Sequence, residues 1–220
     1  IVNVRALLSG IQGLAPFYYV SGNHEYVAYH NDEYSYLIEE YGGTVLNDKA
    51  CAVALPQGTV ILAGVSDPHA DLDYAARKKN RDDKTAYRAR LALVSQNAAE
   101  LKAATPEALC TLLLAHRPEY IKDYLCYDYD LVLSGHAHGG QWRFPPINGL
   151  YAPGQGLFPK YAGGRYDFHL YLMTDNDGQR QKARISSKKD DSDPDKEIVF
   201  CTVNSDFPII LKQTQLDNPS

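Results

Sequence analysis

Three short segments of this 220-residue chain combine histidine with neighbours that bind metals or transfer protons. Asn23 and His24 lie in Ser-Gly-Asn-His-Glu, His116 lies in Ala-His-Arg, and His136 and His138 lie in Ser-Gly-His-Ala-His-Gly-Gly. Amide oxygens and imidazole nitrogens are donors that Mn, Fe, Co and Zn accept, whereas an all-thiolate set favours structural zinc. These residue types therefore predict metal-assisted hydrolysis.

Each of the three segments follows a run of apolar residues that predicts a buried strand. The runs are residues 17–20, 109–115 and 130–133, with helical patterns between them. Strands that alternate with helices predict an α/β fold, in which ligands bind beyond the carboxyl ends of the strands. We therefore expect the three segments to meet at one edge of a sheet flanked by helices.

Other apolar patterns predict the rest of the fold. Helices are expected over 4–14, 34–41 and 86–101, with Asn31 or Asp32 capping the second. Strands are expected over 44–46, 51–55, 60–63, 198–203 and 208–211, and a surface loop over 67–83. Between Thr174 and Lys196 polar residues dominate, which predicts a polar loop or linker over 174–196.

The composition bounds the class of protein. A chain of 220 residues with 45% hydrophobic content predicts a single domain over 1–220. A net charge of -5 gives no specific nucleic-acid signal. The cysteines form no Cys-x-x-Cys pair, which argues against a structural zinc site, and no apolar run approaches the roughly 18 residues of a membrane span.

The three segments resemble the last three blocks of the calcineurin-like metallophosphoesterases, which are Gly-Asn-His-Asp/Glu, a lone His and Gly-His-x-His. The resemblance implies sandwich-like β-sheet layers flanked by helices. It also implies hydrolysis of phosphoester bonds by a hydroxide that bridges two divalent metal ions, which are Mn, Fe, Zn or Co. Residues 139–145, Gly-Gly-Gln-Trp-Arg-Phe-Pro, are similar to a bacterial branch of membrane-associated phosphodiesterases and lipid-nucleotide pyrophosphohydrolases. The expected substrate is a phosphoester-containing small molecule or a lipid nucleotide.

The resemblance also implies roles for single residues. Asn23, His116 and His136 would bind one metal ion, and His138 the other. His24 would be the catalytic acid that protonates the leaving oxygen. Arg117 and Arg143 would contact the substrate phosphate, although either could equally pair with a carboxylate. If the backbone of the last segment is extended, His136 and His138 point to the same side.

Two blocks of the family pattern, Asp-x-His and Gly-Asp, have no match ahead of Gly22. The resemblance therefore implies an amino-terminally truncated domain that lacks its first strands. Membrane association through that missing front end and a cytoplasmic location both stay open. One alternative is a metal-poor, non-catalytic remnant or binding module. A metal-dependent amidohydrolase is disfavoured, because its His-x-His pair usually opens the site along the chain and here the pair closes it.

Overall fold

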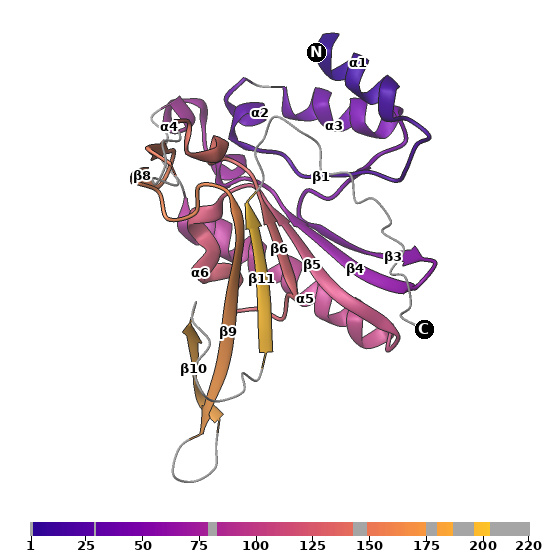
Figure 1. Cartoon of the computed structure of the whole chain (residues 1–220). Coiled ribbons are helices and arrows are strands. Elements are labelled where there is room, and N and C mark those ends of the chain that lie inside the picture. Colours follow the sequence, from indigo (N-terminus) through magenta and orange to yellow (C-terminus); the bar gives the residue numbers. More distant parts are fainter. Residues whose placement is uncertain are drawn as a thin grey trace.

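The computed structural model describes residues 2–28, 30–78, 83–142, 149–174, 180–186 and 196–202. These residues form a seven-stranded mixed sheet of order β10-β9-β11-β6-β5-β4-β3 and two small two-stranded sheets, β1-β2 and β7-β8 (Figure 1). Helices pack against the sheet structure, so the predicted α/β class is confirmed. No helix among the described residues is long and apolar enough to cross a membrane.

The centre of the large sheet is parallel. β4 (Gly58–Val65), β5 (Ala108–Ala115), β6 (Leu131–Ser134) and β11 (Lys196–Thr202) are hydrogen-bonded in parallel, in the order β4-β5-β6-β11. The register sets Val65 opposite Ala115 and Leu114 opposite Leu133, so the carboxyl ends of β4, β5 and β6 lie level. The residues that follow these strands therefore meet at one edge, as predicted for the segments of His116 and His136. The strand that precedes Asn23 belongs instead to the small sheet β1-β2.

The margins of the sheet are antiparallel. β3 (Lys49–Leu55) forms a hairpin with β4, and β9 (Gly164–Thr174) pairs with both β11 and β10 (Arg180–Ser186). The prediction of a polar loop over 174–196 is wrong for residues 180–186, which form β10. Hydrogen bonds between its backbone and that of β9 stabilise a strand that carries few apolar residues. The predicted strand over 208–211 lies outside the described residues.

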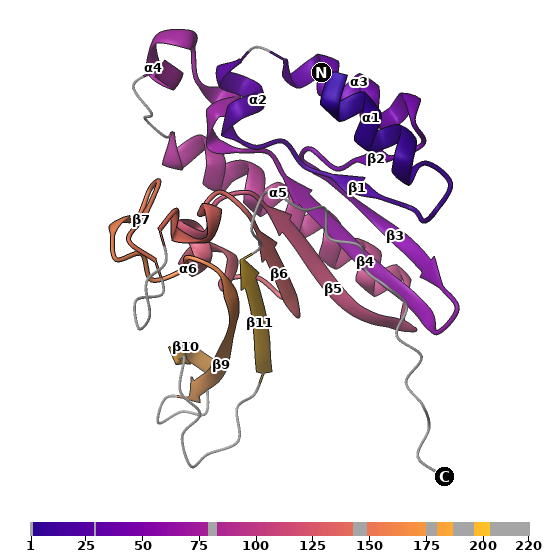
Figure 2. The ribbon, with the colours of Figure 1, turned by 45° about the horizontal axis from the view of Figure 1, so that its top comes forward.

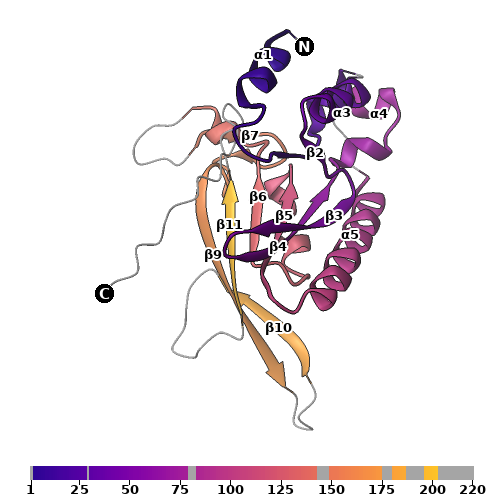
Figure 3. The same ribbon diagram turned by 90° about the vertical axis from the view of Figure 1, so that its right-hand side faces the viewer.

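The longest helix, α5 (Lys84–Ala104), lies along one face of the large sheet (Figure 3). It begins two residues before the apolar pattern, because the Asp83 carboxylate accepts the backbone N–H groups of Thr85 and Ala86 at 3.1 and 3.0 Å. Its buried side packs on alternate residues of β4 and β5. This main core contains Tyr87, Leu91, Val94 and Ala98 of α5 with Ile61, Ala63, Val65, Leu113 and Ala115 of the sheet.

A smaller layer covers part of the other sheet face. β1 (Tyr18–Tyr19) and β2 (Thr44–Val45) pair in parallel, and Tyr18 and Val20 pack with Leu62 and Leu112 of the large sheet. Helices α1 (Val2–Ile11) and α3 (Asn31–Glu40) lie together beyond β1 and β2 (Figure 2). Their apolar sides share a separate cluster made of Leu8, Leu37, Ile38 and Val45.

Two local predictions need correction. His30 occupies the N-cap position of α3 without a side-chain cap bond, so Asn31 and Asp32 already lie in the first turn. The expected surface loop over 67–83 contains η1 (Pro68–Asp71) and α4 (Tyr74–Lys78), and Asp67 and His69 are each only 1% exposed. Asp67 is buried because it pairs with a buried arginine, which sequence polarity alone does not reveal.

Candidate metal centre

Three donor atoms from three separate strand ends converge into a triangle, here called the donor triangle: Asn23 Oδ1, His116 Nε2 and His136 Nδ1. Asn23 Oδ1 lies 2.9 Å from His116 Nε2 and 3.1 Å from His136 Nδ1, and the two ring nitrogens lie 3.1 Å apart. Asn23 opens α2 (Asn23–Val27) after β1, His116 follows β5, and His136 follows β6. The structure therefore brings together the three residues predicted to share one metal ion.

The geometry of the donor triangle suits a divalent cation. Ligands bound at about 2.1 Å are about 3.0 Å apart in octahedral coordination and about 3.4 Å apart in tetrahedral coordination. Hydrogen bonds alone cannot satisfy all three contacts, because Asn23 Oδ1 carries no proton and each ring nitrogen carries at most one. Among the described residues no group of three His, Cys, Asp or Glu is disposed to hold a metal, and here the third donor is an amide oxygen.

Burial keeps the two imidazoles of the triangle in the neutral, metal-binding form. His136 is 2% exposed, and burial followed by the nearby Arg117 charge lowers its pKa. Burial likewise lowers the pKa of His116 to about 4, although the Asp67 carboxylate acts in the opposite direction. Neutral imidazoles offer lone pairs without first releasing a proton.

The backbone around the last segment is left-handed, not extended as predicted. His136 has a φ of 61° and His138 a φ of 48°, and Gly139, Gly140 and Gln141 also have positive φ values. Left-handed backbone is unfavourable for residues other than glycine and often marks functional sites. Because of this turn, the side chain of His136 lies in the donor triangle and that of His138 does not. His138 is the first residue of η3 (His138–Gly140).

The first segment needs its glycine because the His116 ring packs directly against it. A Cβ atom added to Gly22 would lie 2.7 Å from Cε1 of His116. The Gly22 N–H donates to Glu25 Oε2 at 2.9 Å, so that carboxylate supports the loop. This close approach brings the Asn23 loop against the His116 loop.

His24 and His138 lie together on the open side of the triangle. Their ring centroids are 6.4 Å apart, edge to face, with His24 exposed and His138 half-buried. An exposed imidazole next to a metal site can reach a bound substrate. The roles predicted for these two residues therefore stay predictions that the geometry permits.

Arg117 directly follows His116 in the chain. It is 1% exposed and forms a bidentate pair with Asp67, with Nε donating to Oδ2 at 2.6 Å and Nη2 to Oδ1 at 3.1 Å. Burial alone would raise the pKa of Asp67, but the hydrogen bonds and charge of Arg117 outweigh it, and the pKa is lowered. Pairing with a carboxylate, the alternative that the sequence left open for Arg117, is therefore what the structure shows, and contact with substrate stays a prediction. Arg143 lies outside the described residues.

Comparison with known proteins places the chain in a family. The profile of the calcineurin-like phosphoesterase family matches residues 3–140, which include all members of the donor triangle. The chain belongs to this family. An uncharacterized metallophosphoesterase of Bacillus subtilis (strain 168), YkoQ, is 29% identical over 150 residues, which cover 66% of this chain and 47% of YkoQ. The chain thus spans about half the length of the curated relative it matches.

Two solved structures are similar over parts of their length. The sulfate thiohydrolase SoxB of Thermus thermophilus, solved with glycerol, has a TM-score of 0.43 and 16% identity, covering 61% of this chain and 26% of SoxB. A proposed 5′-nucleotidase of Staphylococcus aureus, solved with α-ketoglutarate, has a TM-score of 0.43 and 13% identity, covering 94% of this chain and 42% of that protein.

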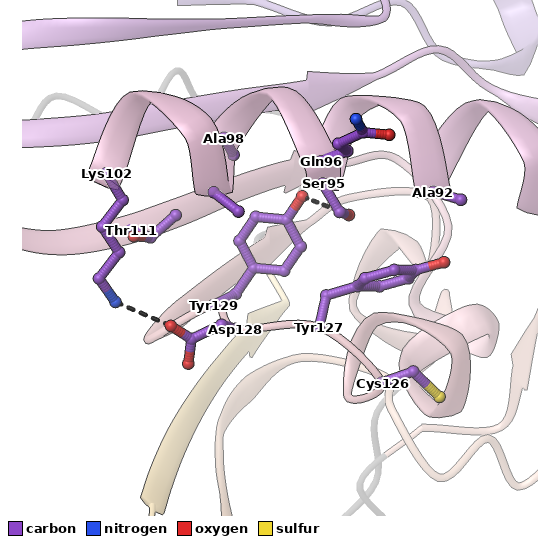
Figure 4. Close-up of a pocket in the computed structure, with 11 residues that line it drawn as sticks. Ala92, Ser95, Gln96, Ala98, Lys102, Thr111, Cys126, Tyr127, Asp128 and Tyr129 are labelled. Carbon is purple, nitrogen blue, oxygen red and sulfur yellow. Dashed lines mark hydrogen bonds and ion pairs between the residues drawn. The ribbon is translucent and has the colours of Figure 1, made fainter. Parts of the chain in front are cut away.

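A separate hollow lies beside α5 (Figure 4). α5 and the segment 126–129 line it, and Tyr129 bonds Ser95 at 2.8 Å while Lys102 pairs with Asp128 at 2.9 Å. Thr111, which also lines it, lies in the first half of β5, away from the end that carries His116. No residue of the donor triangle lines this hollow.

The polar residues around the triangle were not predicted from the sequence. Asp67 lies at the start of the expected surface loop over 67–83, and Asn47 and Asp48 lie in no predicted motif. One available signal was position, because Ser66 and Asp67 follow the apolar strand β4 just as His116 follows β5. A polar residue directly after a buried parallel strand lies at the same edge as the predicted ligands.

Proposed function

We propose that this protein hydrolyses phosphoester bonds with divalent metal ions, the first of them held by the donor triangle. The observation that carries the proposal is the convergence of Asn23 Oδ1, His116 Nε2 and His136 Nδ1, with separations of 2.9, 3.1 and 3.1 Å. When bound, such ions lower the pKa of water and stabilise negative charge on phosphoryl oxygens.

The chain's own residues would divide the remaining work. His138 would hold a second ion, of which Mn is our candidate, and His24 would donate a proton to the leaving oxygen. The exposure of His24 supports this role, because an acid must reach the substrate. The buried pair of Arg117 and Asp67 would keep His116 in place, because Arg117 directly follows it in the chain.

We further propose a phosphodiester or pyrophosphate substrate with an apolar part, such as a lipid nucleotide. Four large apolar side chains are exposed on the segment after the His-x-His turn: Trp142 (63%), Tyr151 (42%), Leu157 (68%) and Phe158 (63%), here called the apolar lip. β7 (Tyr151–Ala152) and β8 (Gly156–Leu157) pair Tyr151 with Leu157, and Leu150 bonds the backbones of Trp142 and Phe158, both at 2.8 Å. An exposed apolar group of this kind commonly marks a binding surface.

Hydrolysis is tested with the metal-loaded protein and a chromogenic phosphodiester. We expect turnover that depends on Mn²⁺ and is lost in His116→Ala. The exposed His30→Ala is the matched control and should keep wild-type turnover. Absence of Mn²⁺ binding would favour the metal-poor binding module, and turnover of a chromogenic amide without turnover of the phosphodiester would favour an amidohydrolase.

The apolar lip is tested by varying the substrate chain. Leu157→Ser with Phe158→Ser should raise KM for a long-chain phosphodiester by about tenfold, since each buried methylene contributes about 0.8 kcal/mol. KM for a short, soluble diester should stay unchanged. Leu93→Ser, at a leucine on α5 that is 57% exposed, is the control. Equal KM changes for both substrates would contradict a role in binding apolar chains.

A further inference from the structure

Two adjacent side chains between β2 and β3 each hold one buried serine. Asn47 Oδ1 accepts the backbone N–H and the hydroxyl of Ser21, both at 2.9 Å. Asp48 accepts the backbone N–H of Ser66 at 2.9 Å and its hydroxyl at 2.7 Å. Ser21 is 0% and Ser66 2% exposed, whereas Asn47 and Asp48 are half-buried.

Ser21 precedes the loop that carries Asn23, and Ser66 precedes Asp67, which pairs with Arg117. Ser21 stands two residues before Asn23, and the Gly22 between them packs against the His116 ring. Ser66 stands next to Asp67, whose carboxylate holds Arg117 at 2.6 Å, and Arg117 follows His116 directly. Asn47 and Asp48 therefore connect the loop that carries Asn23 to Asp67, whose partner Arg117 directly follows His116.

The backbone of Asp48 has an unfavourable conformation, and Arg90 forms additional bonds that stabilise it. Asp48 has a φ of 56°, in the left-handed region that residues other than glycine rarely occupy. Arg90 of α5 pairs with Asp48 Oδ2 at 3.2 Å and also donates to the Asp67 carbonyl at 3.1 Å. Strained backbone that surrounding bonds enforce is a recurrent feature of functional sites.

We propose that Asn47 and Asp48 form a positioning clamp that sets the distance between Asn23 and His116. The proposal rests on the proposed metal site. At most one hydrogen bond joins Asn23 Oδ1 to His116 Nε2 at 2.9 Å, so the separation of these two ligands also depends on the contacts that hold their loops. Outer groups that orient metal ligands typically change metal affinity 10–100-fold when they are removed.

Hydrogen exchange of the metal-free protein tests whether the clamp holds the loops. Asn47→Leu should speed amide exchange in residues 21–27 by about tenfold, and Asp48→Gly should do the same in 66–72. Gly suits the left-handed backbone, so that variant removes the carboxylate without adding strain. Asn47→Asp keeps the acceptor oxygen and should restore slow exchange, and the exposed Lys49→Ala is the neighbouring control.

Equilibrium dialysis with Mn²⁺ then tests whether the clamp positions the ligands. We expect Asn47→Leu and Asp48→Gly each to weaken Mn²⁺ binding by about 10–100-fold, with near wild-type affinity in Asn47→Asp and Lys49→Ala. Unchanged exchange in both variants overturns the clamp. Faster exchange with wild-type affinity overturns its positioning role. Because exchange is measured without metal, it decides the clamp separately from the proposed function.

Discussion

The two sides of the candidate metal centre are built differently. The inner side consists of Asn23, His116 and His136, which follow strands, and of the buried pair of Asp67 and Arg117 next to His116. The outer side consists of His24, His138 and the apolar lip, which stand on short helical turns and a two-stranded hairpin and are exposed to varying degrees. The difference indicates that in the proposed site the sheet would determine where a metal ion binds, whereas the outer side would be free to differ with the substrate.

The sharpest test of this comparison removes an inner donor. His136→Ala should lower Mn²⁺ affinity by more than about 100-fold, because loss of a ligand must exceed the 10–100-fold effect of an outer partner. Turnover should be abolished with it. Elemental analysis of the purified variant and a phosphodiester assay measure the two effects. Full metal content would show that the triangle is not a ligand set.

Removal of the exposed histidine should separate chemistry from metal binding. His24→Ala should reduce turnover by about 10²–10⁴-fold, the usual contribution of a positioned proton donor, and leave metal content unchanged. The two measurements are the same as for His136→Ala. If both variants lost equal amounts of metal, the distinction between the inner and outer sides would fail.

Loss of the Asp67 carboxylate should lower the stability of the folded protein. Asp67→Ala leaves the 1% exposed Arg117 without its main counter-charge and should lower the free energy of unfolding by about 3–5 kcal/mol. The control is Asp128→Ala, because Asp128 is 63% exposed in its pair with Lys102. That variant should cost less than about 1 kcal/mol. Urea unfolding compares them, and similar losses would contradict a special role for the buried pair.

The smallest expected effect is a gradual dependence of stability on pH. The pKa of His116 in the folded protein is about 4, against an ordinary value of 6.5. Between these values the unfolded chain binds a proton that the folded chain does not, so stability of the metal-free protein should fall as the pH drops from 6.5 to 4. His136, with its lowered pKa, acts in the same direction.

The size and the control of this effect follow from linkage. Each histidine adds at most about 1.4 kcal/mol per pH unit, and His136→Gln should flatten the slope of urea midpoints against pH. Asp67 has a folded pKa below its ordinary 3.8, so its stabilising contribution is present above that value and is lost only at lower pH. An identical slope in His136→Gln would contradict the assigned burial effect.

Much of the inner side could be predicted from the sequence. Residues Asn23, His116 and His136 stand after apolar runs. Parallel pairing of β5 and β6 brings His116 and His136 to one edge, whereas Asn23 follows β1 of the separate two-stranded sheet. Their support could not be predicted. Asp67 and Asn47 are polar residues in polar segments, and only the three-dimensional contacts with Arg117 and Ser21 show that they are structural.

The outer part of the sheet was predicted least well. Residues 180–186 carry few apolar side chains, so their pairing with β9 depends on backbone hydrogen bonds that leave no pattern in the sequence. β9 itself was missed, although Phe168, Leu170 and Leu172 alternate with polar or aromatic residues over part of its length. The left-handed turn at His136 also escaped prediction, because only glycine reveals such a conformation by its residue type.

The position of β11 has a consequence for how the chain assembles. β11 lies between β6 and β9, although it comes from residues 196–202, after both of them in the sequence. During synthesis the β9–β10 hairpin therefore has no place in the sheet until residues 196–202 have left the ribosome, whereas β3 to β6 can already pair with one another. Late insertion of a strand between two earlier ones is a non-local step and is expected to be slow. A nascent chain that stops before residue 196 would thus expose the unpaired edge of β6, which can pair with other proteins. We therefore expect a chaperone to assist folding at this stage.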